Sequence, residues 1–183
     1  MKRGVTRMEP IPEKLVNETW QEFASFSHVR VQKETNKVNK NQPNLLAFMM
    51  EFTQDLDQEV KELAIYMFYV VCRMFQKSSK KSLKRISPEE IINCYEKTER
   101  FIESLEGIDE RFLERIAEVQ LSGQPYVMKY VVEALMEAPE EEDPVILTED
   151  DVGYLFLLFK TIVDLLDNKL SLALNQISYR KYE

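Results

Sequence analysis

The stretch LAIYMFYVVC at residues 63–72 decides the fold class of this chain. It is apolar on every face of a helix, and the flanking segments EVKEL and RMFQK continue a helical period. Many of its side chains also favour strands, so a strand is the competing interpretation. Because no turn signals bracket the run, we predict a helix over residues 57–77. A helix that is apolar all round must be surrounded by protein, which places this one at the centre of the fold.

Helical periodicity also precedes this central stretch. We expect a first helix over residues 13–33, followed by a polar linker over residues 32–42. The inward stripe of that helix consists of Val16, Trp20 and Phe23, extended by Phe26. Pro43 then suits the first turn of a second helix, because proline tolerates that position.

Start and stop signals divide the second half of the chain. Ser87 to Glu90 reads as a capping side chain, a proline and a capping-box glutamate, and the helix that it begins is expected to end at Gly107. A fifth helix is expected over residues 109–123, a sixth from Pro125 and a seventh from Thr148. The sequence therefore predicts an all-α bundle of about seven helices.

We expect these helices to form a single domain. Its parts are an N-terminal helix and linker (1–41), a first helix pair (42–77), a middle pair (78–123), a second pair (124–170) and a tail (171–183).

The first and second helix pairs resemble each other. The segment QPNLLAFMMEF that starts at Gln42 aligns with QPYVMKYVVEA at Gln124, and Phe68 aligns with Phe159 in the longer helix of each pair. Two amphipathic helices can match without a common origin, so a chance resemblance remains the alternative. A duplication predicts two pseudo-repeated helix pairs around a central apolar pair.

Composition excludes several classes of function. The chain has four glycines and one histidine, His28, which leaves little material for glycine-rich phosphate loops or multi-histidine metal sites. Cys72 and Cys94 have no CxxC neighbour and are expected to be small buried hydrophobes in a reducing compartment. We predict no catalytic residue, cofactor or metal. With neither a signal segment nor a membrane span in the sequence, the expected location is the cytoplasm.

An acidic segment at residues 137–151 carries eight carboxylates without an intervening Lys or Arg, which equals the net charge of −8. The spacing of a calcium loop is missing, so a solvated loop that binds a basic protein surface is the preferred interpretation. The candidate partner-binding residues are Glu140, Glu141, Glu142, Asp143, Glu149, Asp150 and Asp151.

A basic segment at residues 77–85 has the opposite character. Its cations are Lys77, Lys80, Lys81, Lys84 and Arg85. These side chains could contact the phosphates of a nucleic acid. The acidic balance of the chain favours a solvated linker instead, which neutralises the acidic segment of the same or a neighbouring chain.

The leading hypothesis for function is a non-catalytic helical interaction protein. It would self-associate through apolar helix surface, as a homodimer, and engage a protein partner through its acidic loop. The first alternative is a nucleic-acid-associated regulator that uses residues 77–85. A second alternative is a small-ligand-binding protein or enzyme with a site between the two apolar helices, where aromatic and Met side chains of residues 66–75 would line a pocket.

Overall fold

The computed structural model describes residues 9–79, 82–104, 123–136 and 145–180, with side chains as far as residue 171. Seven α-helices and no strand lie within these ranges, so the predicted all-α bundle is confirmed. The helices are α1 (Glu13–Ala24), α2 (His28–Asn41), α3 (Pro43–Phe52), α4 (Gln58–Ser78), α5 (Pro88–Glu103), α7 (Pro125–Met136) and α8 (Glu149–Arg180). The helix expected over residues 109–123 lies outside the described residues, Gly123 excepted. Within the described ranges, no helix combines the length and the apolar character that crossing a membrane requires.

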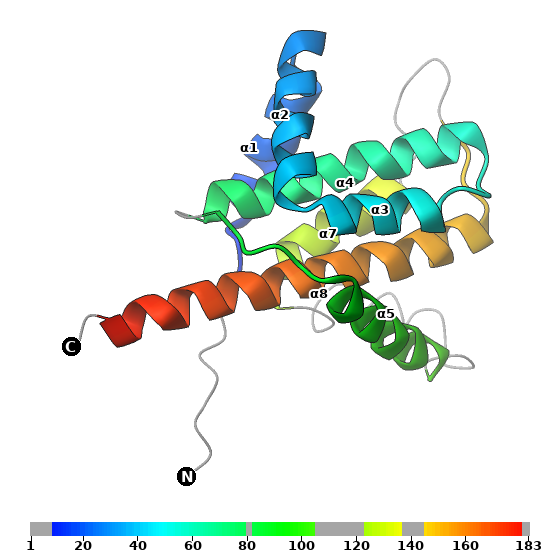
Figure 1. Cartoon of the computed structure of the whole chain (residues 1–183). Helices are drawn as coiled ribbons and strands as arrows, with labels where there is room; N and C mark the ends of the chain where they lie inside the picture. Colours follow the sequence, from blue (N-terminus) through cyan, green and yellow to red (C-terminus); the bar gives the residue numbers. More distant parts are fainter. Residues whose placement is uncertain (1–8, 80–81, 105–122, 137–144, 181–183) are drawn as a thin grey trace.

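Helices α4 and α8 form the centre of the bundle. They contact each other and run in the same direction, from the right to the left of Figure 1. Phe68 and Phe75 of α4 and Phe159 of α8 are completely buried. The prediction of a central helix over residues 57–77 is thus confirmed, and the strand interpretation is wrong.

The predicted start of α5 is confirmed at atomic level. The backbone N–H of Glu90 donates to Ser87 Oγ at 3.2 Å, and the Glu90 carboxylate accepts the backbone N–H of Ser87 at 2.9 Å. This reciprocal pair satisfies two of the backbone donors that a helix N-terminus leaves unpaired.

The packing of the helices follows a pseudo-two-fold pattern. Helix α1 packs against α4 and α7, while α5 packs against α8 and α3. Helices α3 and α7 pack against α4 and α8, respectively. Exchanging α1, α3 and α4 with α5, α7 and α8, respectively, therefore reproduces these contacts, although α4 also packs against α7 more extensively than α8 does against α3.

The predicted alignment of the two halves agrees with burial. Eight of the nine buried residues of α4 have a buried residue 91 positions later, in α8. Those positions in α8 are Leu155, Leu158, Phe159, Thr161, Ile162, Val163, Leu165 and Leu166. Gln42 and Gln124, the residues before the prolines that open α3 and α7, are both buried. The two halves thus place equivalent positions in equivalent environments.

The expected first helix and linker are wrong. The chain breaks at residues 25–27, and a separate helix, α2, occupies most of the expected linker (Figure 1). Only Val38 of this polar helix is fully buried. Side-chain contacts hold it in place instead: Glu34 pairs with Arg73, and the Tyr69 hydroxyl donates to Asn39 at 3.0 Å. The polar sequence of this segment predicts a linker, but contacts with α4 stabilise a helix there. The local pattern does not reveal those contacts.

Smaller differences concern helix faces and ends. Trp20 is 37% exposed rather than inward, and Thr19 takes its place in the core with its hydroxyl donating to the Leu15 carbonyl. Helix α5 ends at Glu103, before Gly107, and α8 continues to Arg180, into the expected tail.

Candidate functional site

The acidic residues at the start of α8 have two different roles. Asp151 accepts the backbone N–H of Thr148 at 2.9 Å, and the Asp151 N–H donates to the Thr148 hydroxyl at 3.1 Å. This carboxylate therefore caps the helix. Glu149 and Asp150 are exposed in the same first turn, where the helix dipole favours negative charge, and no ion pair joins them to a described cation. Glu140, Glu141, Glu142 and Asp143 lie outside the described residues.

The basic segment is partly used by the fold. Lys77 pairs with Glu22 at 2.8 Å, and the Arg85 guanidinium donates to the Lys40 carbonyl at 3.0 Å. Lys84 is exposed, while Lys80 and Lys81 lie outside the described residues. Two of the five predicted cations are thus already bound to acceptors of this chain.

Gln42 anchors the chain that follows the basic segment. Its amide nitrogen donates to the Lys84 carbonyl at 3.0 Å, and its amide oxygen accepts the backbone N–H of Ile86 at 3.1 Å. The Asn44 side chain adds a 2.8 Å bond to the Ile86 carbonyl. These bonds satisfy backbone groups of an irregular segment that has no helix or sheet partner.

The described acidic residues at the start of α8 lie far from the end of α4, where the basic segment begins. Figure 1 places the start of α8 at the right end of the central pair, and the end of α4, where the basic segment begins, at the left end. Their described parts therefore do not neutralise each other within one chain, and neutralisation by a neighbouring chain stays a prediction.

A partly buried ion-pair network joins α1, α2 and α4 beside the basic segment. Arg73 donates to Glu34 at 2.7 Å and to Glu22 at 3.3 Å, and its guanidinium carbon lies 5.0 Å from the centre of the Phe26 ring. The hydrogen bond from Lys77 holds the pKa of Glu22 below its usual value, with help from the charge of Arg73. Burial opposes ionisation of Glu34, but its hydrogen bond and nearby cations outweigh burial and lower its pKa as well. The network attaches α2 to the bundle.

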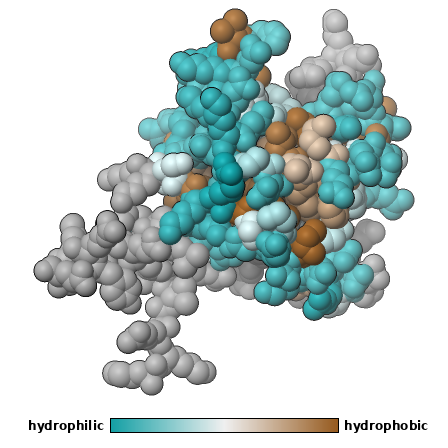
Figure 2. Space-filling view, in the orientation of Figure 1, coloured by the Kyte–Doolittle hydropathy of each residue, from teal (hydrophilic) through white to brown (hydrophobic). Residues whose placement is uncertain are grey.

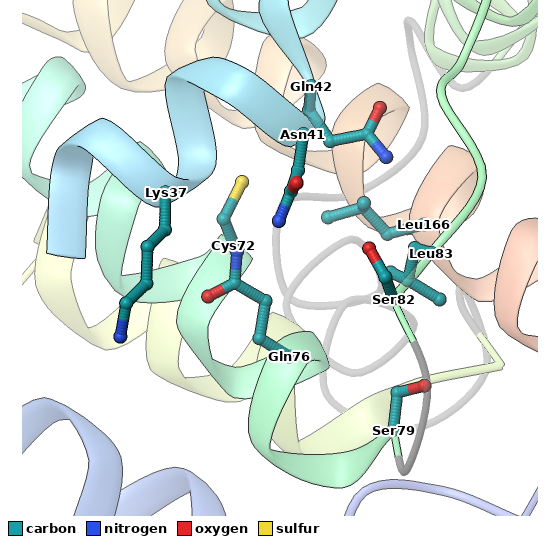
Figure 3. Close-up of a pocket in the computed structure, with 9 residues that line it drawn as sticks. All are labelled: Lys37, Asn41, Gln42, Cys72, Gln76, Ser79, Ser82, Leu83 and Leu166. Atoms are coloured by element: carbon teal, nitrogen blue, oxygen red, sulfur yellow. The ribbon is translucent and has the colours of Figure 1, made fainter.

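A cavity of about 290 Å³ opens next to this network, where α2, the end of α4, the segment after it and α8 meet (Figure 3). Its size is near the lower end of the roughly 300–1,000 Å³ range of ligand pockets. Most of its wall is apolar, and amide and hydroxyl groups supply the rest. None of its lining residues has a carboxylate, but the ammonium group of Lys37 is paired with Glu34 at 2.9 Å. The lining residues are Lys37, Asn41, Gln42, Cys72, Gln76, Ser79, Ser82, Leu83 and Leu166.

This cavity differs from the pocket that the aromatic run predicted. Met67, Phe68, Met74 and Phe75 are fully buried in the core, and only Tyr66 of the run is substantially exposed. The run is therefore core and offers neither a pocket wall nor a subunit interface beyond Tyr66. Of the residues at 66–75, the cavity uses Cys72, which that prediction did not single out.

The remaining chemical candidates are isolated. His28 is exposed at the first position of α2. Both cysteines are free thiols, and burial raises the pKa of each. Among the described residues, no group of three or more His, Cys, Asp and Glu side chains is placed to hold a metal ion.

Comparison with protein-family models, curated proteins and solved structures finds no match for this chain.

Sequence reasoning missed the cavity because its wall comes from three segments that are distant in the sequence: residues 37–42, residues 72–83 and Leu166. One signal was present: the Gln-Pro pairs at residues 42–43 and 124–125 mark buried glutamines. What those glutamines bind depends on which segments the fold brings to them.

Proposed function

We propose that this chain is a non-catalytic interaction protein that assembles with a second copy and uses its acidic end to bind a basic protein surface. The observation that supports the proposal is that the start of α8, with the described acidic residues 149–151, and the end of α4, where the basic segment begins, lie at opposite ends of the central helix pair. A two-fold interface brings a patch of one copy against a different patch of the other, and the reverse pair forms at the same time. Two copies lying side by side in opposite directions would match each acidic end with a basic end.

Exposed apolar side chains provide the surface between the charged ends. Met50 of α3 is 44% exposed and Ile92 of α5 is 43% exposed. Figure 2 shows apolar side chains gathered on the face of the molecule that carries α3. Scattered apolar residues are normal on a surface, so the complementary charges, rather than this area, direct the proposal to a second copy.

A charge-exchange experiment tests this arrangement. One variant carries Lys at Glu140, Glu141, Glu142 and Asp143, and the other carries Glu at Lys80, Lys81 and Lys84. Each variant alone should lose self-association, because it then presents like charges at both matching ends. An equimolar mixture should recover it. In a mixed dimer the unchanged basic end of the first variant meets the unchanged acidic end of the second, and the two altered ends, now basic and acidic, attract each other.

A matched control carries Lys at Glu18, Glu51 and Glu103, three exposed acidic residues outside the acidic segment. It should associate as the unmodified chain does. Equal loss in the control and in the acidic-end variant, or no recovery in the mixture, would refute the arrangement.

A nucleic-acid role for residues 77–85 is the alternative proposal. Lys77 and Arg85 bind acceptors of this chain, which leaves less positive charge for phosphates. The K80E/K81E/K84E variant decides between the two proposals. Salt-sensitive retardation of DNA or RNA by the unmodified chain that disappears in the variant would support the nucleic-acid role.

A further inference from the structure

Helix α2 carries its four cations along one face. Arg30, Lys33, Lys37 and Lys40 follow one another at intervals of three, four and three residues, so they lie within about 80° of one another around the helix axis. All four are exposed. Val38, the only fully buried residue of α2, lies outside this arc. The four cations, called the basic stripe below, are therefore open to solvent beside the buried side of the helix.

The basic stripe continues into the basic segment that follows α4. The Arg85 guanidinium donates to the Lys40 carbonyl at 3.0 Å, and the Gln42 amide nitrogen donates to the Lys84 carbonyl at 3.0 Å. Lys84 and Arg85 therefore lie beside the C-terminal end of α2. Lys40 and Arg85 are 45 positions apart in the sequence, and only the fold brings them together.

The fold neutralises only part of this positive charge. Two carboxylates, Glu22 and Glu34, serve four cations in the network that joins α1, α2 and α4. Arg73 pairs with both, and its buried Nε still lacks an acceptor. Lys33 and Lys40 form no ion pair with any residue that the structure describes. This end of the molecule therefore has more cations than its ion pairs neutralise.

The second half of the chain does not repeat the basic stripe. In the alignment that matches Gln42 with Gln124, the four positions of the stripe correspond to Phe112, Arg115, Val119 and Ser122. These four residues lie outside the described residues, so the comparison concerns the sequence alone. The second half has the acidic segment instead, in a connection after α7 that is longer than the one after α3. Each half thus carries a charged feature that the other half lacks.

We propose that the basic stripe, extended by Lys84 and Arg85, binds the acidic segment of this chain (residues 137–151), supplied by a second copy. The inference rests on the proposed function and names the surface on which the acidic end docks. The acidic segment has eight carboxylates and no cation, which complements this surface. Figure 2 shows a mostly hydrophilic surface over α2, as a contact directed by charge requires. The start of α8 lies at the other end of the central helix pair, which favours a second copy as the source.

A synthetic peptide of residues 137–151 tests this surface on the full chain. The chain is kept below the concentration at which it self-associates, so that its own acidic segments leave the basic stripe unoccupied. Fluorescence anisotropy of the labelled peptide should show binding at about 0.05 M salt and weaker binding at about 0.5 M, because screening weakens attraction between exposed charges. A peptide in which amides replace all eight carboxylates should not bind.

Two matched variants locate the contact. Lys33→Glu combined with Lys40→Glu leaves the ion-pair network unchanged and should weaken peptide binding by about tenfold or more, because two attractive contacts become repulsive. Lys14→Glu combined with Lys97→Glu changes the net charge equally at exposed positions of α1 and α5. This control should bind the peptide as the unmodified chain does. The K33E/K40E variant should also lose self-association, measured by sedimentation equilibrium.

The outcomes separate the inference from the proposed function. No binding of the peptide, or binding that K33E/K40E and the control weaken equally, would overturn the inference alone if the chain still assembles through its charged ends. A chain that stays monomeric yet binds the peptide through the stripe would refute the proposed assembly and support the stripe as the binding surface. Duplex DNA that displaces the peptide and binds more tightly at the same salt would overturn the inference in favour of a nucleic-acid surface.

Discussion

The side-chain oxygen of Gln124 accepts the backbone N–H of Ile11 at 2.7 Å, although the two residues are 113 positions apart. Gln42 makes the same bond to Ile86 in the first half of the chain. Both isoleucines are fully buried and both stand just before a helix, α1 or α5. Each glutamine therefore attaches the start of an outer helix to the core of the bundle.

Gln124→Leu should destabilise the chain markedly. It leaves the Ile11 N–H without its acceptor and the buried Asp167 carboxylate without the Gln124 donor. A buried polar group that loses its partner costs about 1–3 kcal/mol, so the free energy of unfolding should fall by at least that amount. Urea unfolding measures the loss, and Gln21→Leu, at an exposed position of α1, should change it by less than about 0.5 kcal/mol. Equal effects of both substitutions would contradict the role of Gln124.

Two glycines should respond to alanine in opposite directions. Gly123→Ala forces the Asp167 carboxylate to move, and overpacking of this kind typically costs about 1–3 kcal/mol. Gly153 lies in α8 with open space around it, so Gly153→Ala should stabilise the chain by about 0.5–1 kcal/mol through helix propensity. Thermal unfolding of both variants checks the sign of each change. Stabilisation by Gly123→Ala would show that the two positions are not in close contact.

The ion-pair network predicts a pH dependence of stability. The pKa values of Glu22 and Glu34 are lowered in the folded chain, so their contribution is present above the unfolded value of 4.5 and is lost as the pH falls through the folded values. Arg73→Met removes a shared partner of both carboxylates. This variant should be less stable at pH 7 by about 1.5–3 kcal/mol and should lose less stability than the unmodified chain on acidification to about pH 3.

Arg100→Met is the control for that series because Arg100 pairs with the exposed Glu96. Exposed pairs contribute about 0–1 kcal/mol, so this variant should follow the pH profile of the unmodified chain. If Arg73→Met instead loses as much stability on acidification as the unmodified chain, Arg73 does not lower the pKa of its carboxylate partners.

The central helix pair should tolerate truncation equally poorly in both halves. Phe68 and Phe159 occupy equivalent, completely buried positions in α4 and α8. Replacing either with Ala should lower the free energy of unfolding by about 3–5 kcal/mol, because a cavity is left in the core. Ile92→Ala, at a position 43% exposed, should cost far less. A small effect at only one of the two phenylalanines would contradict their equivalence.

The sequence was most informative where a local signal and the final packing agree. Ser87 and Glu90 cap α5 as their spacing predicts, since a capping box depends only on neighbouring residues. The run at residues 63–72 is buried as its apolar character predicts, because no other environment accommodates such a helix. The equivalence of Phe68 and Phe159 also follows from the alignment of the two halves, because both aligned positions are buried.

The sequence was least informative where a partner from another segment decides the outcome. Helix α2 depends on Arg73 and Tyr69 of α4, which no pattern within residues 28–41 announces. The cavity depends on which groups Gln42 and Gln124 bind, and identical Gln-Pro pairs bind different partners in the two halves. Such features require the tertiary arrangement.

Sedimentation equilibrium of the full chain at low and high salt tests the central claim, assembly through opposite charged ends, most directly. At about 0.05 M salt, where screening is weak, we expect twice the mass of a single chain. At about 0.5 M salt the dimer should dissociate at the same protein concentration, because screening weakens attraction between exposed charges. The mass of a single chain at both salt concentrations, or a dimer that salt does not affect, would contradict the account.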